Sequence, residues 1–112
     1  AVAATAVLTA AGAAQAQSPV SEKPADLADL QCMAIYAIMA NQPEHQSGAA
    51  LGVFYHLGRL EGRGPGVDWL DRMRTYADAT TLAELAPHGD RCGEEMSRAA
   101  QAMQAVGASM TD

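Results

Sequence analysis

The fold is decided by one stretch near the C-terminus, Cys92–Met110, which reads CGEEMSRAAQAMQAVGASM. From Cys92 onward its apolar residues recur at alternating steps of four and three, and polar residues occupy most positions between them. One narrow face is therefore apolar, which predicts a long helix that packs this face on a partner. The candidate apolar binding stripe consists of Met96, Ala99, Met103, Val106 and Met110.

The stretch begins at one of only two cysteines, Cys32 and Cys92. Two cysteines in a small chain with an export signal predict one disulfide. They lie 60 positions apart, unlike a redox C-x-x-C pair, and no histidine or cysteine stands at zinc-ligand spacing to either. Closing so long a loop stabilises a fold by about 4 kcal/mol on the chain-entropy argument. We expect this bond to clamp the long helix to the helix that contains Cys32.

The first residues have the features of an export signal. Residues 1–14 carry no charge and are rich in alanine, and Ala14-Gln15-Ala16 is an A-x-A cleavage site. The run is shorter than the roughly 20 residues of a transmembrane span. We therefore expect a signal peptide over 1–16 that is truncated at its start, and a periplasmic or secreted mature chain without a membrane span. Residues 17–25 contain Pro, Ser and charge without periodicity, which predicts a flexible segment before a single helical domain over 26–112.

Two helices are expected in the first half of this domain. Asp26 can cap the first helix, which is apolar over most of its circumference and should lie at the centre of the bundle before ending ahead of Pro43. The second helix runs from about Pro43 to Glu61, and Gly48 and Gly52 permit close approach of a neighbour. Its predicted buried face consists of Ala50, Val53, Phe54, Leu57 and Leu60.

The second half of the domain continues the helical pattern. A third helix is predicted from about 67 to 79, with Trp69, Met73 and Tyr76 on its apolar face. Thr81 and Glu84 form a capping-box pattern that opens a short segment, which is broken or kinked at Pro87 and Gly89 before the long helix begins near Asp90. No alternating strand pattern occurs in the sequence, so we predict an all-α bundle of four to five helices with one disulfide.

Charge and motifs exclude several functions. Thirteen acidic and seven basic side chains give a formal net charge of -6, which disfavours binding to nucleic acid. The sequence has neither a G-x-S-x-G motif nor a C-x-x-C-H haem site, so we predict no enzyme and no cofactor. Met96, Met103 and Met110 stand two helical turns apart, which favours core packing over copper binding. The three histidines, His45, His56 and His88, are expected to be exposed or edge residues rather than metal ligands.

A candidate anion site stands at the end of the second helix. Arg59 and Arg63 are four residues apart and precede a glycine-rich turn, so two guanidinium groups and free backbone N–H groups could face one space. The alternative is ordinary helix-end chemistry, in which Glu61 or Asp68 pairs with these arginines.

The leader ending at Ala16, together with Cys32, Cys92 and the short helices between them, resembles the HdeA/HdeB family of periplasmic acid-stress chaperones. The segment Tyr55–Arg63 and the Met-striped tail depart from that family. The resemblance implies a protein that loses dimer contacts in acid and holds unfolding clients on apolar surface. The sequence is therefore compatible with three functions: an exported helical binding protein or chaperone with clients or a homo-oligomer as partners, a structural or interaction protein, and a small anion- or metal-binding module.

Overall fold

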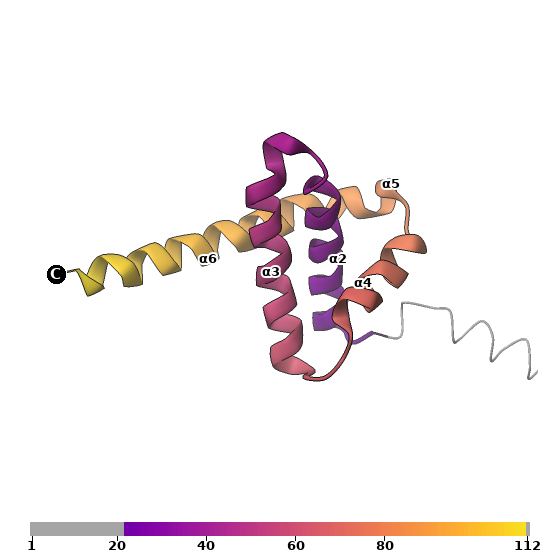
Figure 1. Ribbon diagram of the computed structural model, residues 1–112, viewed down its shortest axis with the longest axis horizontal. Helices are drawn as coiled ribbons and strands as arrows, with labels where there is room; N and C mark the ends of the chain where they lie inside the picture. Colours follow the sequence, from indigo (N-terminus) through magenta and orange to yellow (C-terminus); the bar gives the residue numbers. More distant parts are fainter. Residues whose placement is uncertain (1–21, 112) are drawn as a thin grey trace, which may run out of the picture.

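The computed structural model describes residues 22–111, which fold into helices joined by short turns, with no strand among them (Figure 1). The predicted all-α class is confirmed. The predicted signal peptide and residues 17–21 lie outside the described residues. The helices are α2 (Pro24–Met39), α3 (Gln46–Arg63), α4 (Trp69–Asp78), α5 (Leu82–Leu85) and α6 (Gly89–Met110), with 3₁₀ turns at Pro43–His45 and Ala86–His88.

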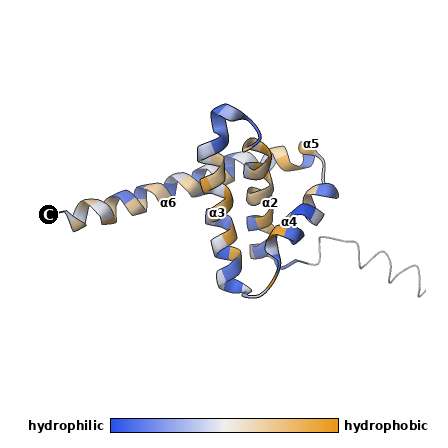
Figure 2. Ribbon diagram, viewed as in Figure 1, coloured by the Kyte–Doolittle hydropathy of each residue, from blue (hydrophilic) through white to orange (hydrophobic). Residues whose placement is uncertain are grey.

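Helix α2 lies at the centre, as its apolar circumference predicts, and packs on α3, α4 and α6. Most of its length is hydrophobic in Figure 2. It begins at Pro24, two residues before the predicted cap, because proline fits a first turn that needs no N–H donor. Asp26 therefore lies inside the first turn, where it is buried. The predicted flexible segment also ends earlier than expected, since Glu22 pairs with Arg72 at 2.6 Å.

The buried face of α3 agrees with the predicted one in part, because Leu60 is buried and Val53 and Leu57 pack against the core, but it is rotated away from Phe54. Phe54 is 67% exposed, whereas Ala49, Gly52 and His56 are buried with Leu60. The cause is close approach at Gly52, where an added Cβ would lie 2.5 Å from the ring of Tyr36. This approach turns the small residues of α3 toward α2 and leaves the phenylalanine in solvent.

The apolar core forms two clusters around α2. One consists of Leu30, Met33, Leu60 and Trp69, and the other of Ala34, Tyr76 and Leu85. The predicted inner face of α4 is confirmed, because Trp69 and Tyr76 are buried and Met73 packs against both clusters. Asp68 caps this helix by accepting a hydrogen bond from the backbone N–H of Asp71.

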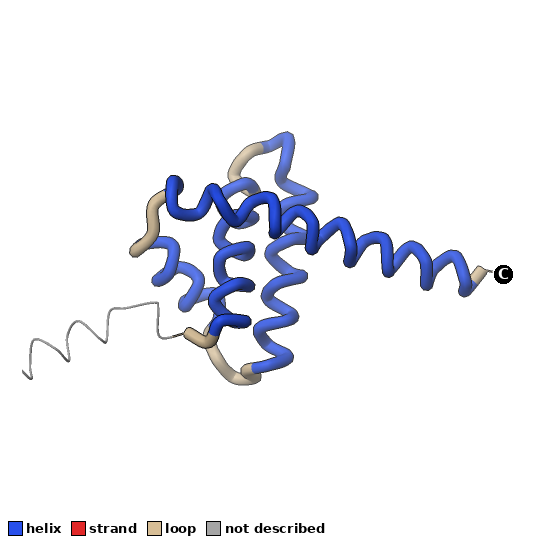
Figure 3. The backbone as a smooth tube through the Cα atoms, turned by 180° about the vertical axis from the view of Figure 1, so that it is seen from behind, coloured by secondary structure: helices blue, strands red, loops and turns tan. Residues whose placement is uncertain are grey.

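The predicted capping box and break before the long helix are both present. The Thr81 hydroxyl accepts from the backbone N–H of Glu84, and the Glu84 carboxylate accepts from the backbone N–H of Thr81. Pro87 lies in the 3₁₀ turn that separates α5 from α6. The backbone stays helical through this turn, so α5, the turn and α6 follow one another without a loop (Figure 3).

Helix α6 is clamped to α2 by the predicted disulfide between Cys32 and Cys92, whose Cα atoms lie 5.5 Å apart. It runs crosswise over α2 and α3 and then projects beyond the bundle (Figure 3). Residues 100–111 are all exposed, and we call Ala100–Met110 the arm. The prediction that Met103 and Met110 pack in the core is therefore wrong, because a crosswise helix meets the bundle over only its first turns.

Candidate functional site

A buried hydrogen bond joins α2 to α3. Nδ1 of His56 lies 2.7 Å from Oδ1 of Asp29, and the two residues are 0% and 1% exposed. The expectation that His56 is an exposed or edge residue is wrong. Its position continues the face of small residues that starts at Ala49 and Gly52, so the close approach of the helices buries it.

Two arginines from the end of α3 close over this pair. Arg63 donates from Nε to Asp26 at 2.8 Å and from Nη2 to Asp29. Nε of Arg59 lies 3.1 Å from Oδ1 of Asp29. We call Asp26, Asp29, His56, Arg59 and Arg63 the ionic cluster. The carboxylates that pair with the two arginines therefore belong to Asp26 and Asp29 of α2. Anion binding at Arg59 and Arg63 stays a prediction, and an anion would have to compete with these carboxylates.

The contacts of the cluster shift the pKa values of Asp29, Arg59 and Arg63. Burial raises the pKa of Asp29, but hydrogen bonds from His56 and Arg63 and the charges of Arg59 and Arg63 outweigh burial, so the net pKa lies below its usual value. Hydrogen bonds to Asp29 and Asp26 are the main cause of the raised pKa of Arg63. The pKa of Arg59 is also raised, mainly because its guanidinium donates a hydrogen bond to the Tyr55 hydroxyl. Asp29 is therefore ionised at neutral pH although it is buried.

The other side of the His56 ring faces a different set of groups. Its Nε2 atom is buried and has no hydrogen-bond partner. The sulfur of Cys32 and the carboxylate of Glu95 lie nearby, and one potential ligand atom each from His56, Cys32 and Glu95 lies within 4.8 Å of the other two. Helices α2, α3 and α6 each contribute one of them. We call Cys32, Cys92, His56 and Glu95 the sulfur corner.

Neighbouring polar groups hold the sulfur corner in place. Arg91 donates to the Cys32 sulfur at 3.4 Å and to Glu95 at 3.1 Å. Tyr36 donates its hydroxyl to the backbone carbonyl of Cys92 at 3.0 Å and stacks on His56 with the ring centres 5.9 Å apart. Burial and the charge of Glu95 raise the pKa of Tyr36. The phenol therefore stays neutral and acts as a donor.

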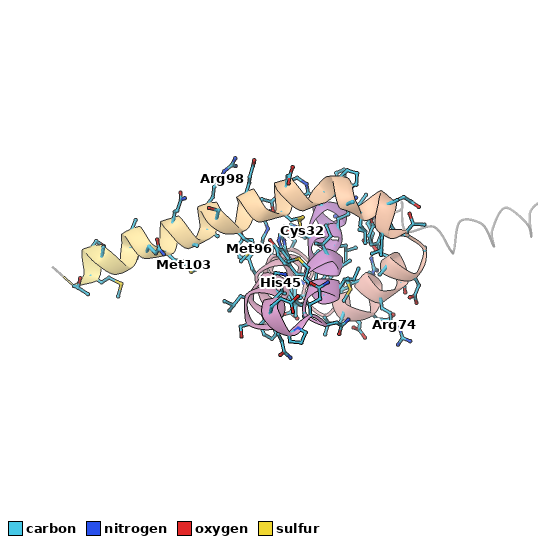
Figure 4. The ribbon with its side chains drawn as sticks, turned by 90° about the horizontal axis from the view of Figure 1, so that it is seen from above. Cys32, His45, Arg74, Met96, Arg98 and Met103 are labelled. Atoms are coloured by element: carbon cyan, nitrogen blue, oxygen red, sulfur yellow. A yellow bond between two sulfur atoms is a disulfide. The ribbon has the colours of Figure 1, made fainter. Side chains whose placement is uncertain are left out.

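The candidate binding stripe divides where α6 leaves the bundle. Met96 and Ala99 are half-buried, while Met103, Val106 and Met110 are 69%, 60% and 78% exposed. Figure 4 shows Met103 on the projecting part of α6, far from Cys32. We call Met103, Val106 and Met110 the arm face. A shallow apolar hollow of about 350 Å³ runs along it and includes Ala102 and Gly107.

A second apolar groove, of about 250 Å³, lies between α2 and the α5–α6 turn. Its lining consists of Ile35, Ile38, Met39, Leu82, Leu85, Ala86 and Gly89.

The two remaining histidines agree with expectation, since His45 is exposed and His88 is half-exposed.

Sequence reasoning missed Asp29, His56 and Glu95 as members of a site. One signal was present: Asp26 and Asp29 stand three apart in an otherwise apolar helix, and His56, Arg59 and Arg63 repeat the steps of three and four on the next one. Opposite charges at such spacing on neighbouring helices indicate paired faces. No comparable signal links His56 with Glu95, because their proximity depends on the crossing of α6.

No protein-family model matches this sequence, and neither a curated protein nor a solved structure matches it. Within residues 22–111, no helix combines the length and the hydropathy needed to cross a bilayer.

Proposed function

We propose that this protein is an exported helical binding protein that acts by protein–protein contact through the arm face, and that a second copy of the chain occupies this face. The exposure of Met103, Val106 and Met110 on a projecting helix carries the proposal. A one-sided apolar helix without a partner loses the stabilisation that burial would supply, and a segment as short as the arm is marginal alone in water.

The spacing of the stripe suits a second helix of the same kind. Alternating steps of three and four are the a and d positions of a coiled coil, in which side chains from one helix fill the gaps of another. The positions flanking the arm face are Ala100, Ala102, Gly107 and Ser109. Their small side chains permit close approach of two helices.

The distribution of charge favours a second copy over other occupants. The chain carries a net charge of -6, which opposes self-association, but residues 99–111 contain no charged side chain. Two arms can therefore pair without repulsion. An antiparallel, two-fold arrangement places the two acidic bundles at opposite ends of the paired arms, whereas a parallel one brings them side by side. We therefore propose the antiparallel dimer.

Sedimentation of the oxidised chain over a range of concentrations tests this proposal. The wild type should dimerise reversibly, and Met103→Glu should be monomeric because it places a carboxylate in the paired face. Gln104→Glu adds the same charge to the neighbouring residue outside the arm face and should dimerise like the wild type. A monomeric wild type, or equal behaviour of the two variants, would contradict the dimer.

If the protein is an acid-stress chaperone, the same face would be occupied by an unfolding client protein instead of a second copy of the chain. Aggregation of a client protein, followed at pH 7 and at about pH 2–3 with an apolar dye in parallel, separates the two. A monomeric wild type that suppresses aggregation, with the suppression lost in Met103→Glu and kept in Gln104→Glu, would replace the second copy by a client.

A further inference from the structure

We propose that the sulfur corner is a site for zinc or a similar divalent metal ion in the reduced chain, with Cys32, Cys92, His56 and Glu95 as ligands. In the oxidised chain both sulfurs are spent in the disulfide. In the reduced chain they become two thiolates beside an imidazole and a carboxylate. These are the ligand types that zinc takes in four-coordinate protein sites.

The orphaned nitrogen of His56 is the observation that carries this inference. A buried nitrogen without a hydrogen-bond partner costs stability, and a metal ion would complete it. Asp29 accepts from Nδ1, so Nε2 is the ring nitrogen left free to bind a metal ion beside Cys32 and Glu95. A carboxylate behind the histidine is a common device of zinc sites, because it fixes the tautomer and raises the basicity of the ligand.

The geometry needs only small adjustments. Bonds of about 2.0–2.3 Å in a tetrahedron place neighbouring ligand atoms about 3.5 Å apart. The ligand atoms of Cys32, His56 and Glu95 already lie within 4.8 Å of one another. Cys92 is joined to Cys32 in the oxidised chain, so its sulfur starts beside the fourth position. The side chain of Glu95 is 26% exposed and opens the corner to solvent, which gives the ion a path of entry.

The charges of the filled corner also balance. Two thiolates and the Glu95 carboxylate carry three negative charges, and the ion and the Arg91 guanidinium carry three positive ones. Arg91 already contacts both the Cys32 sulfur and Glu95. A cation beside a sulfur favours its ionised form, which is the form that binds metals.

The redox step is an ordinary disulfide reduction. A dithiol reductant gives two electrons and two protons to the Cys32–Cys92 bond, and becomes a disulfide itself. The two resulting thiols release their protons to solvent when the metal binds. The covalent clamp between α2 and α6 is thereby replaced by a coordinate one.

Cobalt(II) is a suitable probe, because tetrahedral coordination and thiolate ligands give it visible absorption bands. The full chain, reduced with a phosphine, should bind one cobalt ion with thiolate-to-cobalt bands that zinc abolishes, and the oxidised chain should show none. Asp29→Asn should weaken binding about 10–100-fold, the effect of losing an outer-shell partner.

The sharper comparison uses two neighbouring glutamates of α6. Glu95→Gln should weaken binding at least about tenfold, taking the outer-shell loss as a lower bound. Glu94→Gln, whose side chain is 70% exposed, should bind like the wild type. Absence of the bands in the reduced wild type, or equal affinities of the two variants, would overturn the proposal. If reduction lowers the helical circular dichroism, cobalt should restore it, and failure to do so would also refute the site.

Discussion

Replacing Asp29 by asparagine tests how far the ionic cluster holds α2 and α3 together. The substitution removes one negative charge from beneath His56, Arg59 and Arg63 and leaves the shape nearly unchanged. Breaking a buried pair by removing one partner costs about 3–5 kcal/mol. The side chains of Arg59 and Arg63 are 44% and 36% exposed and can regain water, so we expect the lower end, about 3 kcal/mol.

The assay is denaturant and thermal unfolding of the oxidised, metal-free chain. A loss of about 3 kcal/mol corresponds to at least about 12 °C in melting temperature for a domain of this size. Asp78→Asn, an exposed change on α4, is the matched control and should stay within about 0.5 kcal/mol of the wild type. A loss for Asp29→Asn as small as that of the control would refute the reasoning.

The pH dependence of stability in the wild type and in Asp29→Asn is an independent test of the role of the Asp29 carboxylate. The hydrogen bonds from His56 and Arg63 and the charges of Arg59 and Arg63 hold the pKa of Asp29 below its usual value in the folded state. Its contribution to stability is therefore complete above the unfolded-state pKa and is lost as the pH falls through the folded-state pKa. The difference in unfolding free energy between wild type and Asp29→Asn should be constant near neutral pH and shrink in acid below about pH 4. A difference that grows in acid would show that another group carries the effect.

Two further predictions concern packing and the clamp. Gly52→Ala should destabilise the fold by about 1–3 kcal/mol, because the added Cβ would overlap the Tyr36 ring. At Gly48 an added Cβ meets nothing within 4 Å, so Gly48→Ala should stabilise α3 by up to about 1 kcal/mol. Equal effects of the two substitutions in thermal unfolding would contradict the close approach of α2 and α3. Replacing Cys32 and Cys92 by serine should cost about 4 kcal/mol in denaturant unfolding, and a loss under about 1 kcal/mol would show that the clamp is not needed.

Most of the fold could be predicted from local sequence signals. Periodicity placed the helices, the capping box at Thr81 opened α5, and Pro87 marked the break before α6. These features depend on residues close in sequence, whose preferences act before tertiary contacts form. The disulfide followed from cysteine number, because two cysteines allow only one intramolecular pair.

The predictions that were wrong concern features that depend on how the helices cross. Phe54 has the spacing of a core residue, but close packing at Gly52 chooses the adjacent face. The burial of His56 follows from that choice. Met103 likewise has core spacing, and the crosswise course of α6 carries it past the bundle. A periodic pattern identifies which face of a helix is apolar, but whether a neighbour lies beside that face is decided by chain topology.

The structure places the buried carboxylate Asp29 far along the chain from the arm face that we propose as the binding surface. Residues 99–111 contain no titratable side chain, and the arm face is already exposed in the structure. Protonation therefore has no group to change within the arm. A chaperone that uncovers its Met stripe in acid would need such a group, or a stripe that is covered at neutral pH. Acid acts instead on the junction of α2 and α3, where protonated Asp29 would leave Arg59 and Arg63 without their shared partner. Any apolar surface uncovered at low pH must then come from the bundle core, beginning with the neighbours of α2 around Leu30 and Leu60.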